Sequence, residues 1–77
     1  MSKTTDQLVR IASAGGGIII RASEKNTDQF VIIATAMANS PYEIKPTLTL
    51  LGAGYEKNTD QLVRIAEAGK GCVVFEI

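Results

Sequence analysis

The sequence has no histidine, no tryptophan and a single cysteine, Cys72. One cysteine excludes an internal disulfide, and the lack of histidine excludes a Cys/His zinc site and a nucleophile activated by histidine. Few of the side chains that enzymes use as acids, bases and nucleophiles remain. We therefore expect a protein that is not an enzyme and that has no cofactor and no metal site.

Neither sign of charge predominates. Eight Lys and Arg residues balance eight Asp and Glu residues, and the basic residues do not cluster, so we expect no binding to nucleic acid. The longest apolar run, Phe30 to Ala34, is far shorter than the roughly 20 residues that cross a bilayer. No charged segment leads into an apolar run at the start, as a secretory signal would require. We expect a cytoplasmic protein that does not enter membranes.

One phrase occurs three times in this short chain. TDQLVRIA at 5–12 recurs unchanged at 59–66, and TDQFVIIA at 27–34 is a diverged middle copy. In each copy a Thr or Asn stands three positions before a Gln, which is the spacing of a capping box at a helix start. An Asp in the first turn suits the helix dipole, and apolar residues three and four apart form one stripe. Each copy therefore predicts a short amphipathic helix.

A strand is expected after each helix. The segments 18–20 and 72–75 are β-branched or aromatic, and 47–51 alternates in polarity. Gly15–Gly17 and Gly69–Gly71 follow the outer helices and predict that these helices end at glycine caps. Because strand–helix–strand crossovers are right-handed, the intervening helices belong on one face of a parallel sheet.

The fold class predicted is therefore α/β, with three tandem helix–strand repeats forming a small, mostly parallel three-stranded sheet that has helices on one face. A chain of 77 residues has room for one core, so we expect a single domain over 1–77. The spaced leucines and the Asn/Cys ladder of leucine-rich repeats are absent, so no family is indicated. The repeats cover about 4–23, 26–52 and 58–77.

The second face of this sheet is expected to be apolar and uncovered. Parallel sheets with two apolar faces are nearly always covered on both, and this chain has no segment left to do so. The middle helix also carries Ile32 where the outer copies carry Arg10 and Arg64, either because it is buried in an interface or because the outer helices flank it. We expect a homo-oligomer, most simply a two-fold dimer, that completes the fold. The interface residues predicted are Ile19, Ile32, Val73, Phe75 and Ile77.

The segment Leu51–Lys57 is the best candidate for a ligand site. It follows a predicted strand and leads into a helix, as dinucleotide-binding loops do, and Glu76 ends the next strand, about where such sites place a ribose ligand. Two features oppose this interpretation: Lys57 stands where the third glycine belongs, and the equivalent loop at 21–26 has no glycine. The ligand-binding residues predicted are Gly52, Gly54 and Lys57.

Three functions remain open. The first is a non-enzymatic interaction and oligomerisation module, supported by the apolar second face of the sheet. The second is a small-ligand or nucleotide-binding domain that uses the loop Gly52–Lys57. The third is a designed or recently duplicated repeat scaffold without a specific activity, which the identity of the outer copies suggests.

Overall fold

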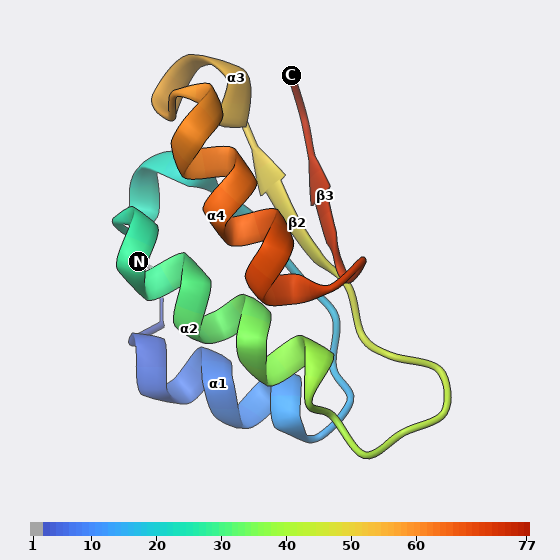
Figure 1. The fold of residues 1–77 in the computed structure, drawn as a ribbon. Coiled ribbons are helices and arrows are strands. Elements are labelled where there is room, and N and C mark those ends of the chain that lie inside the picture. The colour runs from blue at the N-terminus through green and yellow to red at the C-terminus, as the bar shows by residue number, and fades with distance from the viewer. Residues whose placement is uncertain (1–2) are drawn as a thin grey trace.

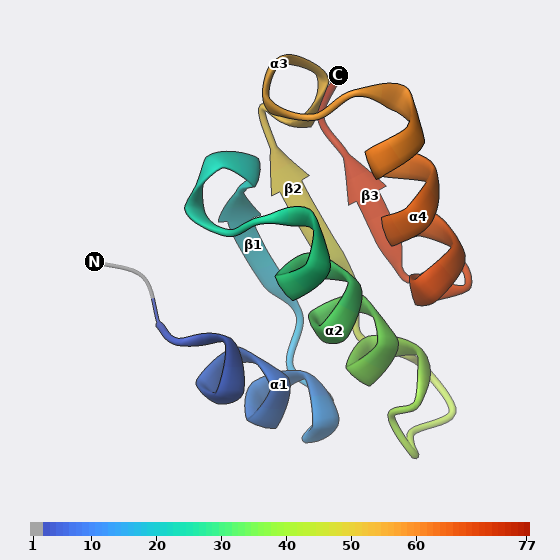
Figure 2. The same cartoon turned by 60° about the vertical axis from the view of Figure 1, so that its left-hand side comes forward.

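The structure, a computed structural model that describes residues 3–77, is a three-stranded parallel sheet with helices packed on one face (Figures 1 and 2). The strands lie side by side in chain order, β1-β2-β3. The predicted α/β class and parallel sheet are confirmed. In chain order the elements are α1 (Thr5–Ser13), β1 (Ile18–Arg21), the 3-10 turn η1 (Ala22–Glu24), α2 (Thr27–Ala38), β2 (Leu48–Leu51), α3 (Ala53–Glu56), α4 (Thr59–Gly69) and β3 (Val73–Phe75).

The three longer helices form one layer, with α2 between α1 and α4 (Figure 2). Because α2 is flanked on both sides, its side chains Phe30, Ile33 and Met37 are fully buried. In the sheet, Leu48 and Leu50 of the central strand β2 point into the same core and are fully buried. The core therefore lies between α2 and β2. No helix within residues 3–77 is long and apolar enough to span a membrane.

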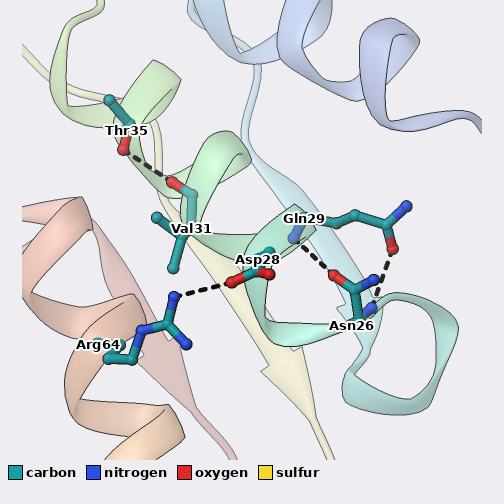
Figure 3. Close-up of polar contacts among 6 residues, drawn as sticks. All are labelled: Asn26, Asp28, Gln29, Val31, Thr35 and Arg64. Carbon is teal, nitrogen blue, oxygen red and sulfur yellow. Dashed lines mark hydrogen bonds and ion pairs between the residues drawn. The ribbon is translucent and has the colours of Figure 1, made fainter.

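All three predicted capping boxes are present. At the start of α2 the backbone N–H of Gln29 donates to Asn26 Oδ1 at 2.8 Å, and the Gln29 Oε1 accepts from the Asn26 N–H at 3.0 Å (Figure 3). The same reciprocal pairs join Thr4 to Gln7 and Asn58 to Gln61. Each box satisfies two backbone donors that a helix start would otherwise leave unpaired, so the three helices begin where the sequence predicts.

The helix ends agree with prediction in one copy and differ in the other. After α1, Gly15 adopts the left-handed conformation with φ of 93°, as expected of a glycine cap. The prediction that Gly69 caps α4 is wrong, because Gly69 is the last residue of the helix and Lys70 is the left-handed cap residue with φ of 48°. A Cβ at position 69 would lie 2.4 Å from Val73 Cγ2. Gly69 is therefore needed for close packing of α4 on β3.

Two short helical turns follow β1 and β2, where the sequence indicated only connecting loops. These turns, η1 and α3, pack against each other at the carboxyl end of the sheet. Each inserts one fully buried alanine, Ala22 and Ala53 respectively. Alanine allows this close approach because its side chain is a single methyl group, a feature that hydrophobic periodicity does not detect.

The strand register decides which predicted interface residues lie on the uncovered face of the sheet. Leu48 pairs with Ile18 on one side and with Val73 on the other, and Leu50 pairs with Phe75. Val73 and Phe75 therefore lie on the helix-covered face and pack against the core, whereas Ile19 lies on the uncovered face. The expectation that Val73 and Phe75 share an uncovered face with Ile19 is wrong. It is Val74 that lies in the row of Ile19, because Val73 pairs with Leu48.

The remaining two predicted interface residues lie elsewhere. Ile32 is 53% exposed on the solvent side of α2, at the position that Arg10 and Arg64 hold in the outer helices. The flanking helices explain the apolar character of α2, and they leave Ile32 uncovered. Ile77 is exposed beyond the end of β3, where its backbone lies close to Gly54.

Candidate functional site

The uncovered face of the sheet, called here the open face, carries apolar side chains in solvent. Ile19, Thr49 and Val74 form one row across the three strands, since Thr49 pairs with both neighbours. Ile19 is 73% exposed and Val74 is 52% exposed. Two exposed charged residues stand at the carboxyl end of this face, Arg21 on β1 and Glu76 after β3. The open face thus combines an apolar row with opposite charges on its two outer strands.

A shallow groove of about 380 Å³ lies at the carboxyl ends of the strands, at the loop that the sequence singled out. Glu76 closes one wall, where its Oε1 accepts a hydrogen bond from the Gly52 N–H at 2.8 Å. Arg21 supplies the positive charge of the groove and Tyr55 a ring that is almost wholly exposed. The lining residues are Arg21, Ser23, Leu51, Gly52, Tyr55, Glu56 and Glu76.

Of the three predicted ligand residues, only Gly52 lines this groove. Gly54 faces Ile77, whose Cα would lie 3.1 Å from an added Cβ. Lys57 is turned inward: its Nζ donates to the Lys25 carbonyl oxygen at 3.0 Å and stands 5.4 Å from the centre of the Phe30 ring. The ammonium group of Lys57 is therefore committed to the protein. Sequence reasoning missed the groove residues Arg21, at the end of β1, and Tyr55 of α3. The packing of η1 against α3 brings these two segments together.

Lys57 is expected to contribute to stability. A hydrogen bond from a charged donor and a cation–π contact together contribute about 2 kcal/mol. Lys57→Met keeps the apolar stem and removes the charge, so we expect the free energy of unfolding, measured by urea titration, to fall by about 1–2 kcal/mol. Lys25→Met is the matched control, since Lys25 donates to the Lys3 carbonyl and, within residues 3–77, Lys57 rather than Lys25 lies over an aromatic ring. Equal losses in the two variants would contradict a role for the Phe30 ring.

Two kinds of polar contact join neighbouring copies, and the first of them recurs at equivalent positions. Lys25 Nζ donates to the Lys3 carbonyl oxygen at 2.8 Å, and Lys57 Nζ donates in the same way to the Lys25 carbonyl oxygen. In addition, Arg64 of α4 donates to Asp28 Oδ1 of α2 at 2.8 Å (Figure 3). In each case a side chain of the later copy reaches the preceding copy. The starts of the three helices are therefore held side by side.

Within residues 3–77 the Arg64–Asp28 pair has no equivalent between α2 and α1, because Ile32 stands at the position of the arginine, while Asp6 stands at that of the aspartate. Both members of an exposed pair such as Arg64–Asp28 remain largely in solvent, where such pairs contribute about 0.2–1 kcal/mol. We expect Ile32→Arg to restore the pair with Asp6 and to raise Tm by about 2–4 °C in a thermal melt. Adding Asp6→Asn to this variant should remove the gain, and an undiminished gain would contradict the pairing.

The described residues offer little further chemistry. Cys72, the free cysteine, is buried, as its apolar neighbours predict. Among residues 3–77 no group of three or more Cys, Asp or Glu side chains is placed to hold a metal ion. The first-turn acids Asp6, Asp28 and Asp60 stand on separate helices, and Asp28 is engaged by Arg64.

The fold and its surfaces define a small α/β protein with a parallel sheet covered on one face. The sequence matches no protein-family model and no curated protein, and the structure matches no solved structure.

Proposed function

We propose that this chain is a non-enzymatic interaction module that self-associates through the open face of its sheet. The observation that carries the proposal is the row that Ile19 and Val74 form with Thr49, both exposed on a face that no element within residues 3–77 covers. Parallel sheets are usually covered on both faces, because apolar area removed from water stabilises the folded protein by about 25 cal/mol per Å². We place the protein in the cytoplasm, where the thiol of Cys72 stays reduced.

The open face is complementary to itself. A two-fold axis parallel to the strands stacks two open faces so that β1 of one chain lies opposite β3 of the other. Ile19 then faces Val74 of the partner subunit, and Arg21 faces Glu76 of the partner subunit. Each of these contacts occurs twice. Because the strands are only three or four residues long, the buried area is small, and we expect dissociation in the micromolar range or weaker.

Sedimentation equilibrium of lysine variants tests this interface. Ile19→Lys and Val74→Lys each place a charge in the centre of the stacked faces, so we expect the dimer to dissociate at least tenfold more readily. Ile32→Lys is the matched control, since it introduces the same charge at an exposed isoleucine on the helix side of the molecule. An unchanged dimer in the two sheet variants, or equal loss in all three, would overturn the proposed interface.

A second candidate function is supported by the groove that Arg21, Gly52 and Tyr55 line. In open α/β sheets, ligands bind beyond the carboxyl ends of the strands, which is where this groove lies. A small anionic ligand would meet Arg21, and its apolar part would meet Tyr55. A thermal-shift screen with nucleotides tests this function: a rise in Tm that Arg21→Ser abolishes supports it, and no rise with any nucleotide removes it. A chain that neither associates nor binds a ligand would fit a repeat scaffold without a specific activity.

A further inference from the structure

The contacts between helices run in one direction and leave unused groups at the two ends of the helix layer. Each lysine donates to the carbonyl of the equivalent lysine in the preceding copy, and Arg64 of the third copy binds Asp28 of the second. By the same rule, the carboxylate of Asp60 and the carbonyl of Lys57 at the α4 end could accept hydrogen bonds from a following copy. The side chains of Lys3 and Arg10 at the α1 end could donate hydrogen bonds to a preceding copy. Within residues 3–77, neither Asp60 nor Arg10 has an ion-pair partner.

Burial of the apolar side chains shows the same asymmetry. The isoleucine that faces the preceding helix is fully buried in α2 and α4, as Ile33 and Ile65, but its counterpart Ile11 in α1 is 37% exposed. The valine that faces the following helix is half-buried in α1 and α2, whereas Val63 in α4 is 47% exposed. Each outer helix therefore exposes the side chain that its missing neighbour would cover. Beside Ile11, a groove of about 390 Å³ runs along α1 and is lined by Lys3, Gln7, Arg10, Ile11 and Ala14.

The edge of the sheet at β3 is also incomplete. Val73 and Phe75 are only half-buried, although Leu48 and Leu50, their partners in β2, are fully buried. The bonds between β2 and β3 use Cys72 and Glu76, so the alternate residues Val73 and Phe75 direct their backbone groups outward. Neither a proline nor a charged residue lies within Val73–Phe75, although such residues often protect natural edge strands.

Repeat proteins ordinarily end in atypical copies whose outer side is polar. In this chain the two outer copies instead share an identical phrase, at 5–12 and 59–66, and each retains the side chains of an interior contact. A second copy of the same chain is therefore the occupant that fits both ends, because α4 and α1 then meet as α2 meets α4 within one chain.

We propose that copies of this chain join end to end, with the α4–β3 edge of one copy bound to the α1–β1 edge of the next. Arg10 of the following copy pairs with Asp60, and Lys3 Nζ donates to the Lys57 carbonyl oxygen. Ile11 packs against the α4 flank that Val63 exposes. In the sheet, Ile18 of the following copy continues the row of Leu48 and Val73 in parallel register. This contact is head to tail and does not close, so it generates a series of oligomers rather than one dimer.

This proposal goes beyond association through the open face, and the two contacts can be tested separately. Ile19→Lys blocks the stacked faces and leaves both edges intact, so it serves as the background. By sedimentation velocity we expect this variant to form a series whose mean mass rises with concentration. A purely monomeric Ile19→Lys chain at millimolar concentration would overturn the end-to-end contact, whatever the result for the open face.

Charge-reversal variants test whether Asp60 and Arg10 form the proposed ion pair between copies. In the Ile19→Lys background, Asp60→Arg or Arg10→Asp alone turns an attraction into a repulsion, so we expect association about fivefold weaker in each. Combining both reversals in one chain restores the pair with its signs exchanged and should restore the series. Asp6→Arg is the matched control, because it changes the same first-turn acid in a copy whose flank is already occupied by α2. Reversals without effect, a control that weakens association as much, or no recovery in the double variant would each overturn the proposal.

Discussion

Replacing Phe30 by alanine is expected to leave most molecules unfolded at 25 °C. Phe30 is fully buried in the first turn of α2, where it packs in the core and its ring faces the Lys57 ammonium group. Truncating a buried phenylalanine costs about 3–5 kcal/mol, and a single core in a chain this small rarely supplies more than that. Circular dichroism at 222 nm, followed through a urea titration, measures the loss.

Phe30→Leu is the matched control for this prediction. Leu8 and Leu62 occupy the equivalent position in the outer helices, so leucine is compatible with the local backbone. We expect Phe30→Leu to remain folded and to lose about 1–2 kcal/mol, because most of the apolar volume is retained. A cooperative melt of Phe30→Ala close to that of the unmodified chain would show that α2 is not the centre of the core.

Ile33→Ala and Ile11→Ala are expected to differ greatly although they delete the same atoms at equivalent positions. Ile33 is fully buried between α2 and its neighbours, so its truncation should cost about 2–5 kcal/mol. Ile11 is 37% exposed, so its truncation should cost less than about 1 kcal/mol. Urea unfolding at a few micromolar, where association contributes little, compares the two.

The same pair of variants separates folding from assembly. If Ile11 forms part of the end-to-end contact, Ile11→Ala should weaken association while leaving the monomer folded. Ile33→Ala should lower the stability of the monomer itself. Equal loss of stability in both variants would mean that α1 is covered by another element of the same chain, and the flank at Ile11 would then not be an open end.

The repeated phrase predicted much of the fold because its signals are local. A capping box needs only a Thr or Asn and a Gln three positions later, and all three helices begin at such pairs. The strands were found from β-branched runs, and the right-handed crossover rule gave the parallel sheet. These are properties of segments shorter than about 12 residues, and each copy repeats them.

The features that sequence reasoning missed depend on contacts between distant segments. Which face of β3 carries Phe75 follows from its register with β2, and a shift of one residue exchanges the faces. Gly69 resembled a cap in sequence, but the contact with Val73 is what excludes a side chain there. The inward direction of Lys57 likewise follows from the packing of the third copy on the second, which places the Lys25 carbonyl within reach.

The candidate surfaces were predicted only in part. The sequence indicated that this chain leaves apolar groups uncovered, and it identified Ile19 and the loop at Gly52. It did not indicate that an outer helix exposes an apolar side chain whose counterpart in α2 is covered, as the contrast between Ile11 and the fully buried Ile33 shows. Predicting that contrast requires knowing that α2 lies between α1 and α4, which follows from the three-dimensional arrangement and not from composition.

The central claim is that the chain completes its surfaces by binding copies of itself. Sedimentation equilibrium of the unmodified protein, from one micromolar to one millimolar, tests this claim most directly. We predict a mean mass that rises with concentration from that of one chain to beyond that of two. A mass equal to one chain throughout this range would contradict the account.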